Sequence, residues 1–363
     1  MGRISIDSAR LTVRCTTEVD LTIVGAGPAG CAAAIVAAEC GFTVVLLERD
    51  EVLTFKPGDC LHPGAAVILT QLGVWEQTAR LSSVRPLGRF QTEGKDISYE
   101  MFGADAHETW RAIHITRPAF DEILRARAAS LGVWIEAGIS KLELHGGGPG
   151  FGRLDVNDVS LRTRYLIDAT GRAGLLTRLL GQRRIRTSPA LVAYYGYFEG
   201  GIAQEQVFST GPTGWHWLAQ ITPEVVNWTA MPFPGRARPV LPPELKALKI
   251  RQPIRGAGVT WEIAPDLASE NILLVGDAAC ALDPASSNGI LLALMSGIAA
   301  ADTIKSVITG GANAAQATRR YRHWISMRYA ASAQRLSSFY QQLNPDWPGL
   351  AHRACRSPEQ LAR

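Results

Sequence analysis

The sequence predicts an α/β protein in which a largely parallel sheet carries an inserted antiparallel sheet and is followed by C-terminal helices. Three observations support this fold class. Near the N-terminus, a glycine-rich turn joins a short apolar run to an alanine-rich stretch. Residues 187–262 place aromatic side chains in short runs separated by Gly and Pro, which is typical of an antiparallel sheet. Two long helical patterns, 289–309 and 314–342, precede an irregular, proline-broken tail after Asn344.

The first unit of the chain has the order strand, turn, helix, strand. Residues 20–24 and 43–47 are short apolar runs, and we expect them to be parallel strands that are buried on both faces. Residues 31–39 are rich in alanine and are predicted to form the helix between them. This order predicts a β-α-β unit.

The turn inside this unit has the spacing GxGxxG. Gly25 permits a tight turn, Gly27 lets the backbone approach a pyrophosphate, and Gly30 lets the helix pack close to the strand. Glu48 ends the second strand, where a ribose hydroxyl needs an acceptor. Arg49 is interpreted either as a cofactor contact or as a solvated surface charge, and the neighbouring Glu48 argues against a 2′-phosphate on the nucleotide. Together these features predict a Rossmann-like dinucleotide-binding domain.

The middle of the chain alternates strands and helices. We expect loops or turns over 51–60, 146–152 and 232–243, helices over 64–72 and 116–131, and strands within 84–115 and over 133–137, 140–144, 160–167 and 272–275.

A second segment with cofactor-binding character begins at the last of these strands. Gly276 and Asp277 follow the strand, and an aspartate at this place can accept a hydrogen bond from a sugar hydroxyl. Asn288 and Gly289 open a helix whose free N–H groups can face an electron-rich ring edge. Pro284 offers a rigid apolar wall to a ring. Taken alone, this segment would also suit an ordinary strand, loop and capped helix.

Composition excludes several classes of protein. Hydrophobic residues make up 47% and charged residues 19% of the 363 residues, which indicates a compact core. The net charge of +4 and the lack of basic runs argue against nucleic-acid binding. Six cysteines without a CxxC pair give no metal-site signal. Neither a signal peptide nor an apolar run of about 18 residues is found, so we expect free thiols, no membrane association and a cytoplasmic location.

Together with Asp168, Ala169, Thr170 and Gly171 at another strand end, these segments resemble the FAD proteins that include the aromatic hydroxylases, tryptophan halogenases and geranylgeranyl reductases. The resemblance covers about residues 19–310 and implies FAD as cofactor. It also implies that an arginine before the middle helix, matched by Arg117, assists the cofactor. The implied cofactor-binding residues are Gly25, Gly27, Pro28, Ala29, Gly30, Glu48, Arg49, Arg117, Ala169, Gly171, Gly276, Asp277, Pro284, Ser287, Asn288, Gly289 and Ile290.

The resemblance also implies how the chain divides. We expect a discontinuous FAD-binding domain of residues 19–85, 105–180 and 262–312, a substrate domain of residues 86–104 and 181–261 with the antiparallel sheet, and a C-terminal helical segment of residues 313–363. This arrangement is similar to the aromatic hydroxylase fold.

Within this group, the stretch 58–63, the serines before Asn288 and the stretch 214–217 look most like the halogenases. Yet the halogenase lysine just after the proline is missing, because residues 64–67 are Gly, Ala, Ala and Val. The tryptophan motif also lacks its Ile-Pro ending. What remains resembles a smaller set, the flavoproteins that modify a tryptophan of a partner protein during tryptophylquinone maturation, as in cysteine tryptophylquinone biogenesis.

This resemblance implies oxygen chemistry at a dry flavin site. Tyr195, Trp215 and Trp217, with Phe198, are expected to line the substrate pocket, although aromatic residues of a sheet are often plain core. His62 is the candidate catalytic residue, either as a proton carrier or, structurally, as a cap of the following helix. The thiols of Cys60 and Cys280 are expected to act as small buried hydrophobes. No second β-α-β unit with a GxGxxG turn is present, so the electrons come either from NAD(P)H that visits the flavin transiently or from a separate reductase.

Three hypotheses stay open at this stage. The first is a monooxygenase acting on a tryptophan of a partner protein, such as a quinoprotein precursor, and it predicts an open flavin face. The second is a hydroxylase of a free aromatic metabolite, with a closed pocket of ligand size. The third is a flavin-fold scaffold that supports cofactor maturation without turnover.

Overall fold

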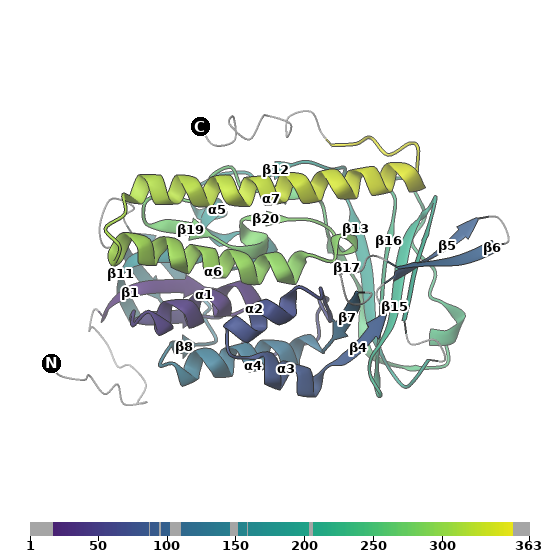
Figure 1. The fold of residues 1–363 in the computed structure, drawn as a ribbon, viewed down its shortest axis with the longest axis horizontal. Helices are drawn as coiled ribbons and strands as arrows, with labels where there is room; N and C mark the ends of the chain where they lie inside the picture. Colours follow the sequence, from purple (N-terminus) through teal and green to yellow (C-terminus); the bar gives the residue numbers. More distant parts are fainter. Residues whose placement is uncertain are drawn as a thin grey trace.

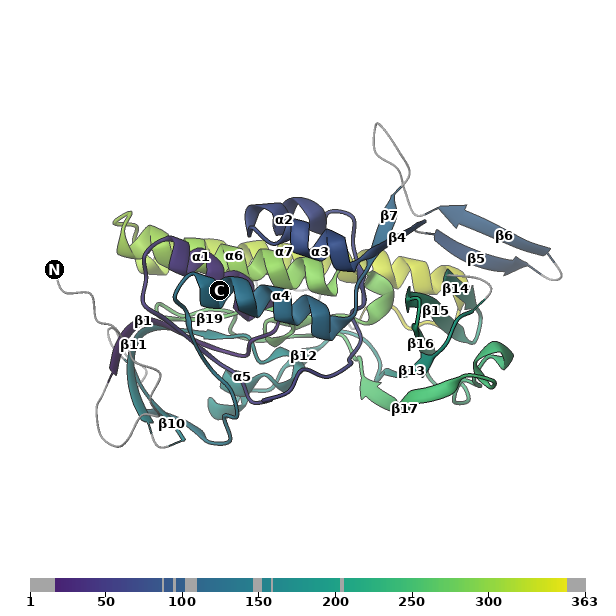
Figure 2. The same ribbon diagram turned by 90° about the horizontal axis from the view of Figure 1, so that it is seen from below.

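The computed structural model describes residues 17–350, except residues 87, 94–95, 102–109, 146–151, 158 and 203–205. The expected turn over 146–152 lies almost entirely outside this part, as do Cys15, Cys355 and most of the C-terminal tail. Figures 1 and 2 show an elongated molecule with the parallel sheet toward one end, the antiparallel sheet toward the other, and the long helices along one side.

The parallel sheet contains five parallel strands and an antiparallel extension. Its order is β8 (Trp134–Glu136), β2 (Val44–Leu47), β1 (Thr17–Val24), β11 (Val159–Asp168), β10 (Gly152–Val156) and β9 (Leu142–His145), with β19 (Ile272–Leu274) also paired to β11. The predicted parallel pairing of β1 and β2 is confirmed, and all four residues of β2 are buried.

The register of this sheet brings distant sequence segments to one edge. Val24 pairs with Leu47 on one side and with Asp168 on the other, and Asp168 pairs with Leu274. The carboxyl ends of four parallel strands therefore end side by side. In open α/β sheets, ligands bind at this edge.

Four long helices pack against one another, and the first of them also contacts β1 and β2: α1 (Pro28–Glu39), α4 (Arg117–Ser130), α6 (Gly289–Ile308) and α7 (Ala314–Leu343). Helix α1 starts three residues before the expected 31–39 because Pro28 suits the first helical position. A Cβ on Gly297 would lie 2.2 Å from the carbonyl oxygen of Ala29, so α6 packs closely against α1.

Helix α6 is long and apolar enough to cross a membrane by length and hydropathy, although Asp302 and Lys305 interrupt its apolar run. It packs against α1 and α7, and its residues Leu294, Ile298 and Ile304 belong to the main hydrophobic core. One face of α6 is therefore part of the core, and 39% of its apolar window is buried.

The expected antiparallel sheet is confirmed. Its order is β17 (Lys249–Gly258), β13 (Val192–Glu199), β16 (Val225–Pro232), β15 (Gly214–Thr222), β14 (Gln206–Gly211), β5 (Gly88–Glu93) and β6 (Asp96–Met101), with only β14 and β5 running parallel to each other. The strands from 88–101 thus join those from 192–258 in one sheet.

Short elements complete the fold. They are β3 (Cys60–Leu61), β4 (Ser83–Pro86), β7 (Arg111–His114), β12 (Ile185–Arg186), β18 (Glu262–Ile263), β20 (Cys280–Ala281), the helices α2 (Ala65–Gln71), α3 (Trp75–Leu81) and α5 (Leu175–Leu179), and 3₁₀ turns at Gly171–Ala173, Pro243–Leu245, Gly276–Ala278 and Pro284–Ser286. Helix α3 was not expected, because only Thr78 is buried and the segment has no apolar stripe.

Candidate active site

One cavity of 1460 Å³ joins the carboxyl edge of the parallel sheet to one face of the antiparallel sheet. All predicted cofactor residues except Gly30 line this cavity, and so do the predicted substrate residues Tyr195, Trp215 and Trp217. The structure thus brings together segments that are up to about 250 residues apart in the sequence.

The glycine turn has the geometry that its spacing predicts. Gly25 has φ +107°, and a Cβ there would lie 2.3 Å from the carbonyl oxygen of Ala169. A Cβ on Gly30 would lie 1.9 Å from the carbonyl oxygen of Gly25, which explains why Gly30 packs behind the turn and not in the cavity. Gly27 faces open space, with no atom within 4 Å of an added Cβ. Side chains at these positions would close the turn or fill the cavity.

Glu48 is held at the cavity wall by two donors to one oxygen. Its Oε2 accepts hydrogen bonds from the backbone N–H of Ala26 at 2.8 Å and from the Arg125 guanidinium at 3.1 Å. Its Oε1 accepts only the N–H of Asp50 among the described residues, at 3.1 Å. Arg49 pairs with Asp50 and its side chain is 76% exposed, at the rim of the cavity. The carboxylate of Glu48 therefore keeps acceptor capacity for a hydroxyl.

Two helix N-termini face the cavity without side-chain caps. The N-terminus of α1 at Gly27 and that of α6 at Asn288 each lack a side-chain capping bond and an acidic residue in the first turn. Uncapped first-turn N–H groups with the positive end of the helix dipole favour an anion or an electron-rich ring edge. These positions fit a pyrophosphate at α1 and a flavin ring edge at α6.

The turn after β11 is organised by a buried carboxylate. Asp168 Oδ1 accepts the Thr170 N–H and hydroxyl, and Oδ2 accepts the Leu176 N–H at 2.8 Å. This places Ala169 and Gly171 on the cavity wall.

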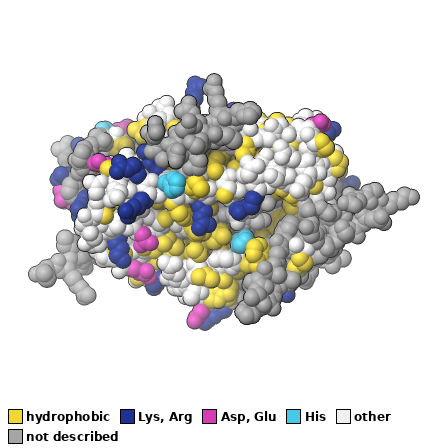
Figure 3. Space-filling model, turned by 45° about the horizontal axis from the view of Figure 1, so that its top comes forward, with side chains coloured by type: hydrophobic (Ala, Val, Ile, Leu, Met, Phe, Trp, Pro, Cys, Tyr) yellow, Lys and Arg dark blue, Asp and Glu magenta, His cyan; other side chains and the backbone are white. Residues whose placement is uncertain are grey.

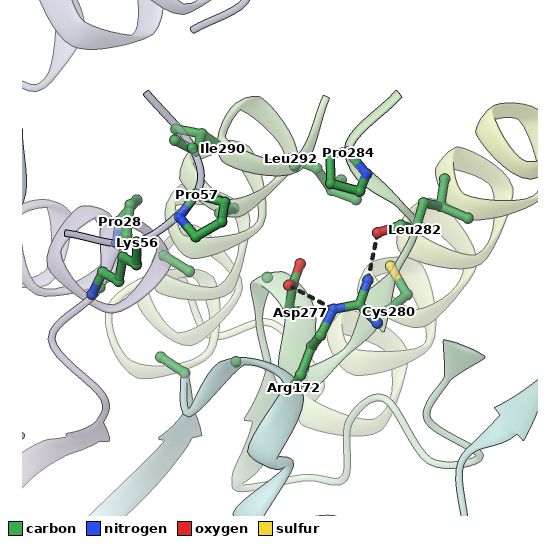
Figure 4. Close-up of a pocket in the computed structure, with 18 of the residues that line it drawn as sticks. Pro28, Lys56, Pro57, Arg172, Asp277, Cys280, Leu282, Pro284, Ile290 and Leu292 are labelled. Atoms are coloured by element: carbon green, nitrogen blue, oxygen red, sulfur yellow. Dashed lines mark hydrogen bonds and ion pairs between the residues drawn. The ribbon is translucent and has the colours of Figure 1, made fainter. Parts of the chain in front are cut away.

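Arg172 follows this turn and was missed at the sequence level. Figure 4 shows its guanidinium reaching Asp277, 3.6 Å away, and the carbonyl oxygen of Leu282. It also donates to the carbonyl oxygen of Thr260 at 3.0 Å. One cation therefore ties the Gly276–Ala278 turn to the loop before Pro284, whose ring faces the same opening as Ile290 in Figure 4.

Arg117 lies at the first position of α4 in a buried charge cluster. Its guanidinium donates to Asp121 at 3.0 Å and to the carbonyl oxygen of Pro57 at 3.0 Å. Lys56 pairs with the same buried Asp121 at 2.9 Å. Both cations line the cavity and share the one carboxylate of Asp121, so this three-residue cluster keeps a net positive charge.

Asp59 is a second buried carboxyl that the sequence did not single out as a site residue. It is 1% exposed, lines the cavity, and accepts hydrogen bonds from the Arg117 N–H at 3.0 Å and the Tyr197 hydroxyl at 2.6 Å. Burial raises the pKa of this carboxyl to about 7. Asp59 therefore connects the cofactor side of the cavity to strand β13 of the antiparallel sheet.

The cavity face of the antiparallel sheet is aromatic with a polar centre. Tyr195 on β13 pairs with Thr229 on β16, which pairs with Trp217 on β15. The Thr229 hydroxyl donates to Oδ1 of the neighbouring Asn227 at 2.9 Å. Phe198, which was expected in the pocket, does not line the cavity but belongs to the cluster of Leu218, Val226 and Trp228 because its side chain points to the opposite face.

Trp215 belongs to a buried hydrogen-bond network. Its indole N–H donates to the Tyr340 hydroxyl at 2.8 Å, and that hydroxyl donates to Asp283 at 2.8 Å. The Trp261 indole donates to the other Asp283 oxygen at 2.7 Å. Burial raises the pKa of Asp283 to about 6. The network joins strand β15, helix α7 and the Pro284 loop, and neither Asp283 nor Tyr340 was named as a site residue from the sequence.

The structure places His62 away from the cavity lining. Its Nδ1 accepts the Gly64 N–H at 3.0 Å, and its ring packs edge-on against Trp110. Burial lowers the pKa of this imidazole. This geometry is that of the structural alternative, a histidine at the start of α2, and the catalytic role of His62 stays a prediction without geometric support.

The cavity cysteines have the character expected of small hydrophobes. Burial raises the pKa values of Cys60 and Cys280 to about 12, so both stay protonated at neutral pH. The four described cysteines are free.

Outside the cavity, Glu143, His145 and Asp155 bring ligand atoms within 4.8 Å of one another, a group that the cysteine and histidine spacing did not indicate. They lie on an exposed hairpin, where Lys141 and Arg153 already pair with two of them. The group is an exposed ion-pair network.

Comparison with known proteins identifies the family. A family described as FAD binding domain matches residues 18–323. Tryptophan 2-halogenase of Chondromyces crocatus is 28% identical over 364 residues, which cover 90% of this chain and 68% of the relative. Among solved structures, the flavin-dependent halogenase CmlS has a TM-score of 0.78 at 23% identity and covers 91% of this chain, and this chain covers 66% of CmlS. The chain thus spans about two thirds of the length of these relatives.

The peptidyl tryptophan dihydroxylase QhpG has a TM-score of 0.70 at 18% identity, over 90% of this chain and 76% of that one. Sequence relatives are named mainly as halogenases, so the halogenase side of the predicted resemblance is the stronger one, and the tryptophylquinone side is seen in a structural neighbour. The fold and the FAD cofactor are confirmed. The chain belongs to the FAD binding domain family and is a flavin-dependent oxidoreductase of the halogenase and monooxygenase type.

Proposed function

We propose that this chain is an FAD-dependent monooxygenase that oxygenates an electron-rich aromatic ring, and that the ring is a tryptophan side chain of a partner protein. The observation that carries the proposal is the state of the cavity amines. The lysines that line the cavity in the described part of the chain are Lys56 and Lys141, and each is ion-paired, with Asp121 at 2.9 Å and Glu143 at 3.2 Å.

Halogenation by this family needs an amine that holds or guides hypohalous acid, and the matching position lies just after Pro63. In this chain, residues 64–67 open α2 without a lysine, and Ala65 and Leu69 face the core. Lys56 lies on the loop before β3, and its ammonium is shared with the buried Asp121–Arg117 pair. An ammonium in such a pair is a poor carrier of an oxidised halogen, because the ion pair with Asp121 holds it in place.

The cavity residues fit bound FAD. The uncapped N-terminus of α1 suits the pyrophosphate, and Glu48 suits the ribose of the adenosine half. Asp277, positioned by Arg172, suits a sugar-chain hydroxyl, and the N-terminus of α6 suits the electron-rich ring edge. Reduced FAD supplies the activation of dioxygen.

The aromatic face would hold the substrate ring and exclude water. Trp217, Tyr195 and Phe208 present apolar surface on the cavity side, and Asn227 and Thr229 offer the polar groups that orient a ring N–H. An indole, with one N–H donor on an apolar body, suits such a face.

Halogenation is the second candidate, and it is favoured by the names of the sequence relatives. A free aromatic metabolite, in place of a protein-bound tryptophan, is the alternative substrate. Within either reaction, NAD(P)H and a separate reductase stay open as electron donors.

The test supplies the FAD-loaded protein with dioxygen, chemically reduced flavin, bromide and a tryptophan-containing peptide, and reads the product by mass spectrometry. We expect addition of oxygen, unchanged when bromide is omitted. We also expect oxygen addition to persist in Lys56→Met, with Trp228→Phe as a folding control on the far face of the sheet. Bromine in the product, lost in Lys56→Met, would establish halogenation and refute the proposal. Turnover of free aromatic compounds without turnover of peptides would refute the protein-bound substrate.

A further inference from the structure

Helix α7 carries a one-sided charge. Its 30 residues contain five arginines, Arg319, Arg320, Arg322, Arg328 and Arg335, and no Asp or Glu. The net charge of α7 is therefore +5, which exceeds the net charge of +4 of the whole chain. An all-positive helix next to a cavity attracts an acidic partner.

One flank of α7 forms a wall of the same cavity that holds the cofactor residues. Trp324, Met327, Arg328, Ala331 and Arg335 line it, at helical spacings that place them on one side of the helix. Opposite them, α6 contributes an apolar floor of Leu291, Leu292 and Met295. This part of the cavity continues to Pro284 and Ile290 at the flavin position.

The face that carries α7 is seen in Figure 3, where basic side chains surround an exposed hydrophobic area. Met327 is 43% exposed, a large value for an apolar residue in a cavity wall. Arg328 lies over the Trp324 ring at 5.6 Å, and Arg335 contacts the Ser332 hydroxyl. Neither arginine has an ion pair with a described residue. Both are therefore free to pair with an incoming carboxylate.

We infer that this groove, defined as the cavity wall from His323 to Arg335 of α7 with Leu291, Leu292 and Met295 of α6, docks an acidic polypeptide segment of the partner protein and leads its aromatic residue to the flavin. The inference rests on the proposed function and names the surface and the charge of its partner. The groove spans 13 helical residues, which are 12 rises of 1.5 Å or about 18 Å, and this length matches about five to six residues of extended chain.

The pattern of the groove favours a peptide over a small anion. A small anion needs one concentrated cationic pocket, whereas Arg328 and Arg335 lie seven residues apart with the apolar Ala331 between them. Extended segments with acidic side chains on the rim and apolar side chains on the floor complement such a surface. The cofactor end of the groove is where the aromatic residue would enter.

The experiment measures binding and does not depend on turnover. Two labelled peptides share one central tryptophan, flanked in one by glutamates and in the other by glutamines, and each is titrated with the FAD-loaded full chain at low and high salt by fluorescence anisotropy. We expect the Glu peptide to bind at least about tenfold more tightly at low salt, with the difference shrinking at high salt. In Arg328→Glu/Arg335→Glu that preference should vanish.

Arg319→Glu/Arg320→Glu is the matched control, because it reverses the same number of charges and both arginines are exposed on the same helix but do not line this cavity. It should keep the preference within about twofold, since exposed charges away from the groove are screened. Equal binding of both peptides, or an equal loss in the control, would overturn the proposal. Peptide binding that appears only after truncation at Leu350 would also overturn it, because the C-terminal segment would then be the occupant of the groove. The same holds if the parent chain binds no peptide but binds NADPH, and Arg328→Glu/Arg335→Glu abolishes that NADPH binding. A chain that binds the Glu peptide as expected but adds no oxygen to it would refute the proposed function and leave the docking surface standing.

Discussion

The substitution Tyr340→Phe tests the network that joins the substrate face to the Pro284 loop. It removes a hydroxyl that accepts from the Trp215 indole and donates to Asp283, both at 2.8 Å. Trp215 is 4% exposed, so its N–H would be left unpaired at a cost of about 1–3 kcal/mol. At pH 8 Asp283 is ionised, and losing a bond to a carboxylate costs about 1.5–3 kcal/mol more. We expect a loss of about 3–5 kcal/mol in unfolding free energy.

The control for this prediction is Tyr321→Phe. Tyr321 lies on the same helix, is equally buried, and donates one neutral bond to the carbonyl oxygen of Leu274 at 2.6 Å, so its loss should cost about 1 kcal/mol. Urea unfolding at pH 8 compares the two variants at equal slope, and a repeat at pH 5, where Asp283 is largely protonated, should shrink the deficit of Tyr340→Phe. If both variants lose the same unfolding free energy at pH 8, the network does not contribute the stability that we assign to it.

Three further predictions follow from the geometry. Gly25→Ala should abolish FAD retention, since its Cβ would lie 2.3 Å from a carbonyl oxygen. The control Gly132→Ala, also at positive φ but in open space, should retain FAD. Absorbance after desalting measures the retained FAD, and equal loss in both variants would contradict the steric argument. Asp283→Asn should flatten the pH dependence of stability. The native carboxyl keeps its proton up to about pH 6 and the unfolded one only to about pH 4, so the unfolding free energy of the parent falls by up to about 3 kcal/mol as pH rises through this window. An unchanged slope of thermal stability against pH in the variant would refute the prediction. Glu48→Gln should weaken FAD binding about tenfold or more in a titration at constant salt, because the amide loses the pairing with Arg125 and an acceptor for the ribose, and an unchanged Kd would show that Glu48 does not contact the cofactor.

The cofactor half of the site was predictable because its signals are local. A GxGxxG turn after an apolar strand encodes its own backbone geometry, and Gly25 has the positive φ that such a turn requires. Glu48 directly follows β2, and Asp277 lies in the short turn after β19, so the sheet register brings both to one edge. The long helices were predictable for a similar reason, since the periodic, Ala-rich pattern of a segment such as α6 predicts a helix from the local sequence.

The residues that hold the two halves together were not predictable. Asp59 and Tyr197 are 138 residues apart, and Asp283 and Tyr340 are 57 apart, so their pairing depends on tertiary placement that no spacing encodes. His62 illustrates the opposite case, a predicted site residue whose role stays a prediction. Its place beside a flavin-loop motif suggested chemistry, yet a local bond to the Gly64 N–H accounts for its orientation. Nearness to a motif in the sequence is weaker evidence that a polar residue belongs to the site than its burial in the tertiary structure.

The two buried carboxyls suggest how the cavity keeps its dimensions. Asp59 accepts from Tyr197 on β13, and Asp283 accepts from Tyr340, which in turn holds Trp215 on β15. Each carboxyl belongs to the cofactor side, and each network ends on the antiparallel sheet, so the aromatic face is fixed to the flavin side at two points. Burial of both carboxyls is costly, as their raised pKa values show. A reaction that must hold a ring at a set distance from the flavin, with water excluded, gives a physical reason to retain such costly contacts, because a shift of about 1 Å in that distance would slow it markedly.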